Sequence, residues 1–397
     1  MRKDREVDLL GNHLKGKKIG LFATGCIATY KEPSLIRHFR HYGADVQVYM
    51  TEAAQKYVTK DAVEWASLHP PICGLTPDAE HLEEYDAFVV APATLNTIGK
   101  MANGISDNAV TSTLAAALGD LDRAPVLVAP AMHGRLEKNP FYKRNLDSLK
   151  EKGVKVIDPV YKWDKANFPS PHEIVAPTIR EVSKSPLKKK SILVTAGPVP
   201  VWIDDVRLIT NKFRGTLGLK IAEEAYMRGA DVDLIMGPGG LQVPRYINNK
   251  GIRSFDQYYE EVMESLGSKG YDFAIFSAAV ADYAPKKKHE GKIASRGAIK
   301  SIPLKETVKV IESVRKVFPM LDMVTFKYEK GVSQEELERI ASNRVSKGYD
   351  MVVANRGEEM THTEHHSIIV DKNGVISRPR TKDENAFMLL DALERRL

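Results

Sequence analysis

Cysteine is scarce in this sequence: Cys26 and Cys73 are the only two among 397 residues. Two cysteines cannot build a disulfide scaffold or a four-cysteine zinc site, and a reducing cytoplasm is the simplest location for such a chain. Long hydrophobic runs are also missing, since no apolar stretch approaches the roughly 18 residues of a membrane span. The first residues carry charges but no apolar core, which argues against a signal peptide. We therefore expect no membrane partner.

A strong net charge is absent as well. The formal charge is +6, which is too mild to indicate nucleic acid and is compatible with anionic small molecules. Hydrophobic residues make up 43% and charged residues 28%, values that exclude disordered, collagenous and coiled-coil proteins. The length predicts two or three domains, each able to bury its own core.

Short apolar runs alternate with helix-length segments, a pattern typical of parallel-sheet α/β units. In the first half we expect helices at 32–42, 51–59, 107–118 and 141–152, and strands at 17–23, 44–50, 86–91, 125–130 and 154–158. A proline-rich stretch follows, at 159–190, with one helix at about 172–183.

The alternation then restarts. We expect helices at 216–229, 256–267, 333–347 and 382–396, and strands at 191–196, 231–237, 272–278, 323–328 and 349–354. The Asn373-Gly374 pair predicts a hairpin. The predicted fold class is therefore α/β, with two tandem doubly wound, mostly parallel, Rossmann-like sheets in domains 1–182 and 191–397, joined by a linker at 183–190.

Ligands of such sheets bind beyond the carboxyl ends of the strands. The first of these loops, 24–30, has one glycine where a dinucleotide fingerprint needs three, which argues against an NAD site. A single phosphate at the helix start and an ordinary turn both remain open there. The strand ends Ala91-Pro92-Ala93-Thr94 and Pro130-Ala131-Met132-His133 offer small residues, prolines and a hydroxyl, which suit a flat ring.

The segments TGCIATYK, MTEAA, APAT, NGISDN and PAMH, with His81 ahead of the APAT strand, resemble the flavin-dependent cysteine decarboxylase family over about residues 17–140. Its phosphopantothenoylcysteine decarboxylase domains are the most similar. The resemblance implies a flavodoxin-like N-terminal domain and a catalytic role for His81. It also implies that FMN is surrounded by Gly25, Ile27, Ala28, Thr51, Ala91, Thr94 and Asp107.

A flavin meets a chemical need of that reaction. A cysteinyl carboxylate has no electron sink for the carbanion that remains when CO2 departs. Oxidation of the thiol to a thioaldehyde creates the sink, decarboxylation gives an enethiol, and the reduced flavin returns the electrons. A histidine suits acid–base chemistry around the thiol.

The sequence departs from that family at two points. His133 stands where the family commonly has an asparagine that binds the substrate carboxylate, and the adjacent Arg135 could assist it. The region of the substrate-covering flap, 161–169, contains no cysteine. The proton donor for the last reduction is therefore not assigned.

In the second half, Gly215 and Gly218 stand at a predicted helix start beside Lys212 and Arg214, a combination that favours a polyanion. Three further lysines, at 286–288, follow the third strand of this half. Such a run is either a solvated face or a means of neutralising a triphosphate.

The segments TAGP, DDVRLITN, AAVADY and GKI, with TF at 325–326 and AN at 354–355, resemble the phosphopantothenate–cysteine ligase domain over about residues 191–355. That family activates the phosphopantothenate carboxylate with CTP, releasing pyrophosphate, and cysteine then displaces CMP from the acyl-cytidylate. The resemblance implies that Asn211 binds the intermediate and that Lys292 stabilises charge at the α-phosphate. It further implies a Mg²⁺ ion on the triphosphate and substrate contacts from Asp282, Phe326, Gly215 and Lys286.

Both halves thus predict consecutive steps of coenzyme A biosynthesis in one bifunctional enzyme acting on 4′-phosphopantothenate, cysteine and CTP. The resemblance also implies decarboxylase trimers and ligase dimers that combine to a dodecamer. The family's Ser-Ser-Gly-Lys is Phe-Arg-Gly-Thr here, at 213–216, so CTP and ATP both remain open. Two alternatives are a prenyltransferase-like or peptidyl-cysteine decarboxylase domain fused to an unrelated nucleotide-binding domain, and a non-catalytic regulatory flavoprotein.

Overall fold

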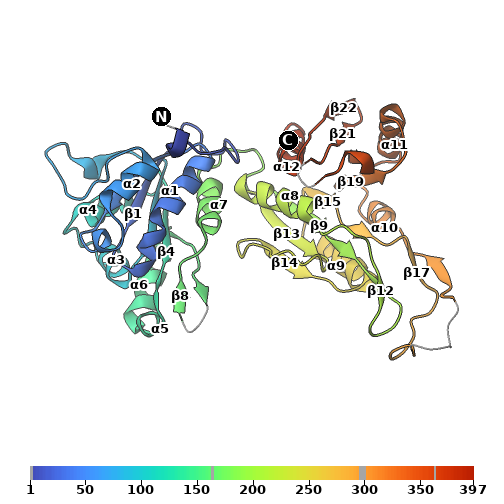
Figure 1. The fold of residues 1–397 in the computed structure, drawn as a ribbon, viewed down its shortest axis with the longest axis horizontal. Helices are drawn as coiled ribbons and strands as arrows, with labels where there is room; N and C mark the ends of the chain where they lie inside the picture. The colour runs from blue at the N-terminus through green and yellow to red at the C-terminus, as the bar shows by residue number, and fades with distance from the viewer. Residues whose placement is uncertain (1–2, 162–164, 295–300, 362–363) are drawn as a thin grey trace. The chain divides into compact units, whose positions relative to one another are not determined.

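The computed structural model describes residues 3–161, 165–294, 301–361 and 364–397. The chain divides into two compact units, Met1–Ser183 and Lys184–Leu397. Each unit is an α/β layer structure built on a sheet that is mostly parallel, so the predicted fold class is confirmed (Figure 1). Among the described residues, no helix has the length and the apolar character needed to cross a bilayer.

The N-terminal unit is built on a five-stranded parallel sheet in the order β2-β1-β3-β4-β6. Its strands are β1 (Lys18–Ala23), β2 (Asp45–Met50), β3 (Ala87–Ala93), β4 (Val126–Pro130) and β6 (Lys155–Val156). Apolar runs form these strands because the central ones are buried on both faces; all seven residues of β3 are buried. The strand order reverses between β1 and β3, which is where flavodoxin-like sheets bind their ligands.

Helices cover both faces of this sheet. Helix α1 (Glu32–His41) packs against α2 (Lys60–Ser67) and α7 (Pro171–Val182), whereas α3 (Leu95–Ala102) packs against α4 (Ala109–Leu118) and α6 (Pro140–Glu151). A small antiparallel sheet is formed by β5 (Met132–His133), β8 (Lys165–Asn167) and β7 (Val160–Tyr161), and a short helix α5 (Gly134–Glu137) follows β5. The N-terminal unit also has four short 3-10 helices, at Lys3–Arg5, Ile27–Lys31 (η2), Ala54–Lys56 (η3) and Glu80–Leu82 (η4), among its described residues. A fifth, at Gly357–Glu359, belongs to the C-terminal unit.

In this unit one helix prediction is wrong and one helix was missed. The expected helix at 51–59 is wrong, because α2 begins only at Lys60, where the Thr59 side chain accepts a hydrogen bond from the Ala62 N–H and so caps the helix start. Helix α3 was not expected. The Thr94 hydroxyl caps this helix by accepting a hydrogen bond from the Thr97 N–H at 3.3 Å. A threonine just after a strand is a residue type that often begins a helix.

The C-terminal unit contains an eight-stranded sheet in the order β14-β13-β9-β15-β19-β20-β21-β22. The strands from β14 to β20 pair in parallel, and β21 pairs antiparallel with both β20 and β22. The strands are β9 (Ser191–Ala196), β13 (Asp231–Met236), β14 (Asn248–Gly251), β15 (Phe273–Phe276), β19 (Asp322–Glu329), β20 (Met351–Arg356), β21 (Ile368–Asp371) and β22 (Gly374–Ser377). The predicted hairpin at Asn373-Gly374 therefore joins β21 and β22.

One face of this sheet carries α8 (Thr216–Met227) and α12 (Lys382–Glu394), and the other carries α9 (Phe255–Ser268), α10 (Val310–Val317) and α11 (Gln334–Ser346) (Figure 1). The buried Arg228 joins the two helices of the first face. Its guanidinium donates to Glu224 and to Asp391, both at 2.7 Å. Arg228 thereby joins the last turns of α8 and α12, and Lys220, which pairs with Asp383, joins their first turns.

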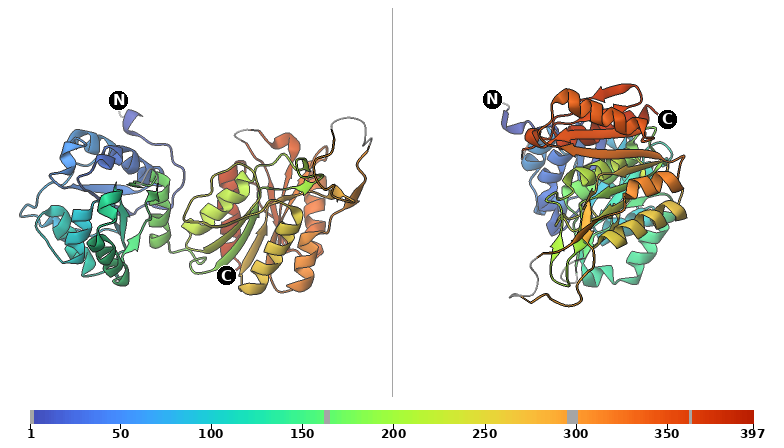
Figure 2. Two further views of the ribbon diagram at one scale, coloured as in Figure 1. Left: turned by 90° about the horizontal axis from the view of Figure 1, so that it is seen from below. Right: turned by 90° about the vertical axis from the view of Figure 1, so that its right-hand side faces the viewer.

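Two hairpins project from this sheet (Figure 2). One joins β11 (Val201–Trp202) to β12 (Leu208–Ile209), and β10 (Pro198–Val199), just before it, pairs with β16 (Ala279–Val280). The other pairs β17 (Tyr283–Pro285) with β18 (Leu304–Glu306). We call residues 283–294 the lysine arm.

Candidate active sites

The first candidate site lies at the carboxyl ends of β1, β2 and β3. The Thr24 hydroxyl donates to the Pro92 carbonyl at 2.7 Å, and the Thr94 N–H donates to the Thr24 hydroxyl at 3.1 Å. A cis peptide bond joins Ala91 to Pro92. The ends of β1 and β3 are therefore held together at the point where the strand order reverses. Thr94, one of the residues predicted to contact the cofactor, lies there.

The loop after β1 lies unusually close to the loop after β2. A Cβ added to Gly25 would come within 2.3 Å of the Ala53 Cβ, so this position accommodates no side chain without a shift. Ile27 and Ala28 follow at the start of η2, and Ile27 is 71% exposed. Thr51 begins the loop after β2, and its hydroxyl accepts from the Ala54 N–H. This close approach of the two loops, which we call the Gly25 cradle, and the exposed Ile27 beside it fit a bound ring cofactor.

His81 lies on η4, which packs against α4. The Tyr49 hydroxyl donates to the Glu80 carbonyl at 2.6 Å and so fixes η4 at the sheet. The His81 Nδ1 is buried and has no hydrogen-bond partner among the described residues. Because a buried polar atom without a partner is rare, the ring is a candidate for a ligand contact.

Two predicted residues lie apart from these strand ends along the chain. Asp107 precedes α4, and its carboxylate accepts from Lys100 at 2.5 Å and from Thr111 at 3.1 Å. The hydrogen bond from Lys100 holds the pKa of Asp107 below its usual value. His133 is exposed in β5, where it pairs with β8, and its Nδ1 accepts from the Arg135 N–H at 3.4 Å. The flap residues 162–164 lie outside the described residues, while Tyr161 and Ala166 pair in β7 and β8.

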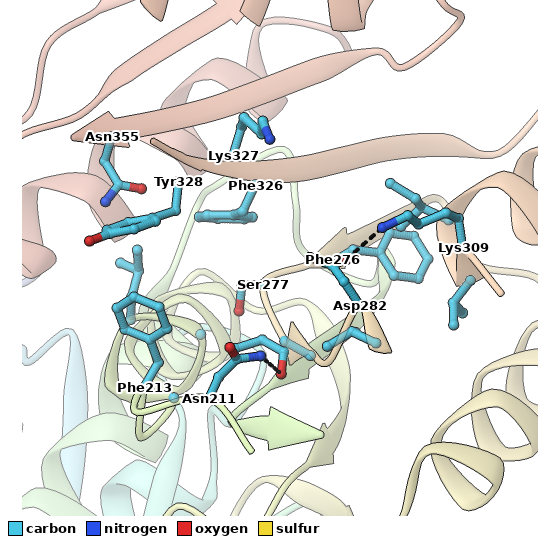
Figure 3. A pocket seen from close by; sticks show the side chains of 18 of the residues that line it. Asn211, Phe213, Phe276, Ser277, Asp282, Lys309, Phe326, Lys327, Tyr328 and Asn355 are labelled. Carbon is cyan, nitrogen blue, oxygen red and sulfur yellow. Dashed lines mark hydrogen bonds and ion pairs between the residues drawn. The ribbon is translucent and has the colours of Figure 1, made fainter. Parts of the chain in front are cut away.

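The second candidate site is a cavity of about 990 Å³ in the C-terminal unit. Four predicted residues line it: Asn211, Gly215, Asp282 and Phe326. Figure 3 shows Phe326, Tyr328 and Asn355 on one side and Asn211 and Phe213 on the other. The Asn211 side chain donates from Nδ2 to the Ala279 carbonyl at 3.0 Å. Asp282 pairs with Lys309 at 2.5 Å, a lysine that the sequence analysis did not single out.

Gly215 forms the N-cap of α8 in a left-handed conformation, with φ of 91°, and a Cβ there would lie 2.4 Å from the Gly197 nitrogen. Glycine is therefore required at this turn. Gly215, Thr216 and Leu217 line the cavity, so the positive end of the α8 dipole lies at the cavity, and no side chain among the described residues caps it.

Lys286 and Lys292 do not line this cavity; both are exposed on the lysine arm. The arm is held by the turn of the β11–β12 hairpin. The buried Asp204 carboxylate accepts from the Ile293 N–H at 3.1 Å and from the Arg207 guanidinium at 2.5 Å, and Asp205 accepts from the Gly291 N–H at 2.9 Å. The DDVR segment, found as a sequence motif, therefore fixes the backbone on either side of Lys292.

The pKa of Asp204 reflects this role. Burial alone raises the pKa of the carboxyl group, but hydrogen bonds from the N–H groups of Val206, Ile293 and Arg207 outweigh burial and lower it far below its usual value. The carboxylate is thus ionised under all ordinary conditions and stabilises the arm through charge-assisted hydrogen bonds.

Replacing Asp204 with asparagine should release the lysine arm. The amide keeps the shape but cannot accept all four hydrogen bonds of the carboxylate, so we expect trypsin to cleave after the arm lysines roughly 10-fold faster. Mass spectrometry of the fragments measures the rate, and Asp233→Asn, in β13, is the matched control. Equal cleavage rates in Asp204→Asn and the unmodified protein would contradict this account.

Among the described residues, no group of three or more His, Cys, Asp or Glu side chains could hold a metal ion. Cys26 and Cys73 are both free thiols. Burial raises the pKa of the Cys26 thiol, a direction that does not favour a reactive thiolate.

The fold and these candidate sites define a two-unit α/β protein with one candidate site at the carboxyl end of the first sheet and a second at a cavity of the other unit. The family model "Flavoprotein" matches residues 9–183, and the model of the "DNA/pantothenate metabolism flavoprotein C-terminal domain" matches residues 187–397.

Curated relatives match both units. The coenzyme A biosynthesis bifunctional protein CoaBC of Thermococcus kodakarensis is 36% identical over 394 residues, covering 97% of this chain and 96% of the relative. The protein of the same name from Bacillus subtilis is 32% identical, covering 86% of each. A crystal structure of the DNA/pantothenate metabolism flavoprotein from Streptococcus pneumoniae is 27% identical with a TM-score of 0.47, covering 53% of this chain and 100% of that one.

The chain belongs to the CoaBC family of bifunctional coenzyme A biosynthesis proteins. The family models match both units, so the alternative of an unrelated second domain is wrong.

Proposed function

We propose that the C-terminal unit couples 4′-phosphopantothenate to cysteine and that the N-terminal unit decarboxylates the product to 4′-phosphopantetheine. The proposed domain limits are 1–182 and 191–397, with the linker at 183–190. The observation that carries the ligase assignment is the convergence of Asn211, Gly215, Asp282 and Phe326 on one cavity, although they come from three different segments of the chain.

In the ligase site, the protein has to position three reactants and neutralise charge. The Asn211 amide, oriented by the Ala279 carbonyl, is placed to hold the acyl-nucleotide. The N-terminus of α8 offers N–H groups to the phosphates. Asp282 and Phe326 hold the nucleoside, which we take to be cytidine. Lys292 and Lys286 are proposed to contact the phosphates. Because neither residue lines the cavity, the lysine arm must either move towards it or contact the cavity of a second copy of the chain.

A Mg²⁺ ion on the triphosphate completes this proposal. Asp282 and Glu312 are the acidic residues among those lining the cavity, and Asp282 is already paired with Lys309. Because the cavity offers so few carboxylates, we propose that the Mg²⁺ ion enters bound to the nucleotide. Its ligands would then be mainly phosphate oxygens and water.

In the decarboxylase site, FMN supplies the reversible oxidation of the substrate thiol that makes loss of CO2 possible. The Gly25 cradle, Ile27 and Ala28 at the start of η2, and Thr51 are proposed to hold it. Ala91 and Thr94 lie on the other side of the reversal point and are proposed to contact the ring. Asp107 is proposed to contact the cofactor from the loop before α4.

The remaining residues of this site are proposed to act on the substrate. His81 moves a proton at the thiol, and His133 donates a hydrogen bond to the carboxylate. We also predict a homo-oligomer in which trimers and dimers combine to a dodecamer. A cytoplasmic location is a further prediction.

The Gly25 cradle gives a direct test of flavin binding. A Gly25→Ala substitution pushes a methyl group against Ala53, so we expect flavin affinity to fall by roughly 10-fold or more, measured by fluorescence titration of the apoprotein. Gly74→Ala is the matched control, because nothing lies within 4 Å of a Cβ at that position. Unchanged affinity in Gly25→Ala would place the cofactor elsewhere.

The proposed pair of reactions is tested by incubating the protein with 4′-phosphopantothenate, cysteine, Mg²⁺ and either CTP or ATP, while following pyrophosphate and CO2. We expect both products with CTP. Absence of both would overturn the proposal, and pyrophosphate without CO2 would overturn the decarboxylase half alone. Faster turnover with ATP would overturn only the choice of nucleotide.

A further inference from the structure

Two buried hydroxyl groups meet at the wall of the cavity in the C-terminal unit. Tyr258, on α9, is 1% exposed and Thr195, on β9, is 0% exposed, and the Tyr258 hydroxyl donates to the Thr195 hydroxyl at 3.1 Å. Tyr258 is one of the residues that line the cavity, whereas Thr195 lies behind them. Because a buried hydroxyl needs a hydrogen bond to offset the loss of water, each of these two groups stabilises the other.

Packing alone does not require the Tyr258 hydroxyl. The ring belongs to an apolar cluster that includes Val262 and Leu266 of the same helix, and a phenylalanine would fill the same place. Among the described residues, Thr195 is the only hydrogen-bond partner of the Tyr258 side chain. The reason for a hydroxyl at this position is therefore found in what Thr195 contacts.

Thr195 holds the start of the loop after β15, residues 277–279, which we call the Ser277 loop. It pairs with the last residue of β15, so this loop begins directly beyond it. The Thr195 carbonyl accepts from the Ser277 N–H at 3.1 Å and from the Ser277 hydroxyl at 2.7 Å, and the Thr195 hydroxyl accepts from the Ala278 N–H at 3.4 Å. The Thr195 hydroxyl thus joins Tyr258 to the loop.

The Ser277 loop in turn orients Asn211. All three loop residues line the cavity, and the Ala279 carbonyl accepts the hydrogen bond from the Asn211 side chain at 3.0 Å (Figure 3). A chain of contacts therefore runs from Tyr258 through Thr195 and the Ser277 loop to the Asn211 amide. Supporting hydrogen bonds of this kind fix the orientation of a group that acts on a substrate.

We propose that Tyr258 is a positioning residue of the ligase site, whose hydroxyl holds the Ser277 loop through Thr195 and so fixes the Asn211 amide. The proposal rests on the proposed ligase function. Tyr258 itself transfers no proton. Burial raises the pKa of Tyr258 to about 12, so the phenol stays protonated at neutral pH and keeps donating to Thr195.

Steady-state kinetics of pyrophosphate release from CTP by the full chain test the proposal. Tyr258→Phe removes one buried hydrogen bond and keeps the packing, so we expect kcat to fall about 3- to 10-fold while the KM for CTP stays within about 2-fold. Thr195→Val should lower kcat at least as much, because it leaves both the Tyr258 hydroxyl and the Ala278 N–H without their partner. Thr195→Ser keeps the hydroxyl and should retain kcat within about 2-fold.

Tyr259→Phe is the matched control. Tyr259 is the next residue of α9, is half-buried, and makes no side-chain hydrogen bond within the part of the chain that the structure describes. It does not belong to the residues that line the cavity. Its replacement should change neither kcat nor KM.

A double-mutant cycle distinguishes positioning from support of the fold. If Tyr258 acts through Asn211, adding Tyr258→Phe to Asn211→Ala should lower kcat by less than about 1.5-fold. A general loss of fold would instead lower kcat by the same factor in both backgrounds. The pH profile of kcat should keep its shape in Tyr258→Phe, because the phenol is not an acid or base of the reaction.

Amide hydrogen exchange gives a readout that needs no turnover. Mass spectrometry of a peptide spanning residues 276–283 should show exchange about 3- to 10-fold faster in Tyr258→Phe and unchanged exchange in Tyr259→Phe. Unchanged exchange in Tyr258→Phe, an equal loss of kcat in both backgrounds, or loss of one limb of the pH profile would each overturn the proposal. A lack of pyrophosphate release by the unmodified protein would overturn the proposed function instead, and the exchange would still show whether Tyr258 holds the loop.

Discussion

Replacing His81 with asparagine should reduce CO2 release from 4′-phosphopantothenoyl-cysteine by about 10²- to 10⁴-fold, the contribution typical of one acid–base group. Asparagine fills the same place but cannot exchange a proton with the substrate thiol. Pyrophosphate release should stay within about 2-fold, because His81 belongs to η4 of the N-terminal unit and the ligase cavity is lined by residues of the C-terminal unit. The two products are measured in the same incubation.

His69→Asn is the matched control for this variant. His69 is another histidine of the N-terminal unit, exposed and paired with Asp45 at 2.7 Å, and its replacement should leave CO2 release unchanged. A loss of both products in His81→Asn would contradict the division of labour between the units. Flavin content, read from the absorbance spectrum, shows whether the variant still holds its cofactor.

Replacing Asn211 with alanine should have the converse effect. Removal of one preorganised hydrogen-bond donor from a reaction site typically lowers the rate by about 10²- to 10³-fold. We therefore expect pyrophosphate release to fall by that factor, while CO2 release from supplied 4′-phosphopantothenoyl-cysteine is retained. The Asn211 side chain lines the cavity and donates a hydrogen bond to the Ala279 carbonyl, so its loss should not unfold the unit.

Asn248→Ala serves as the control, since Asn248 lies on the edge strand β14 and does not line the cavity. Pyrophosphate release in Asn211→Ala within about 3-fold of the original rate would contradict the assignment. Thermal unfolding of both variants checks that any loss is not a loss of fold.

The sheets could be predicted from sequence because their strands are short apolar runs flanked by helix-length segments. Strand β9, for example, has the bounds that its apolar run predicts, 191–196. Helix starts were less accessible, since they depend on which of several hydroxyl residues acts as the cap. Both Thr51 and Thr59 could begin a helix, and the structure uses Thr59.

The site residues divide in a similar way. Motif residues such as Asn211 and Phe326 were accessible because the segments that carry them resemble those of a known family, and the structure brings both to one cavity. Lys309, which pairs with Asp282, and His365, which lies in an irregular segment after β20, line the cavity, but no local pattern marks them as lining residues. Their placement follows from long-range contacts, which a single sequence does not reveal.

The central claim is that one chain performs both reactions in sequence, and labelled cysteine tests it most directly. The protein is supplied with FMN, CTP, Mg²⁺, 4′-phosphopantothenate and cysteine labelled at the carboxyl carbon, without a nicotinamide cofactor. We predict labelled CO2, pyrophosphate and 4′-phosphopantetheine in equal amounts. Pyrophosphate formed in excess while the label stays in an undecarboxylated product would contradict the account.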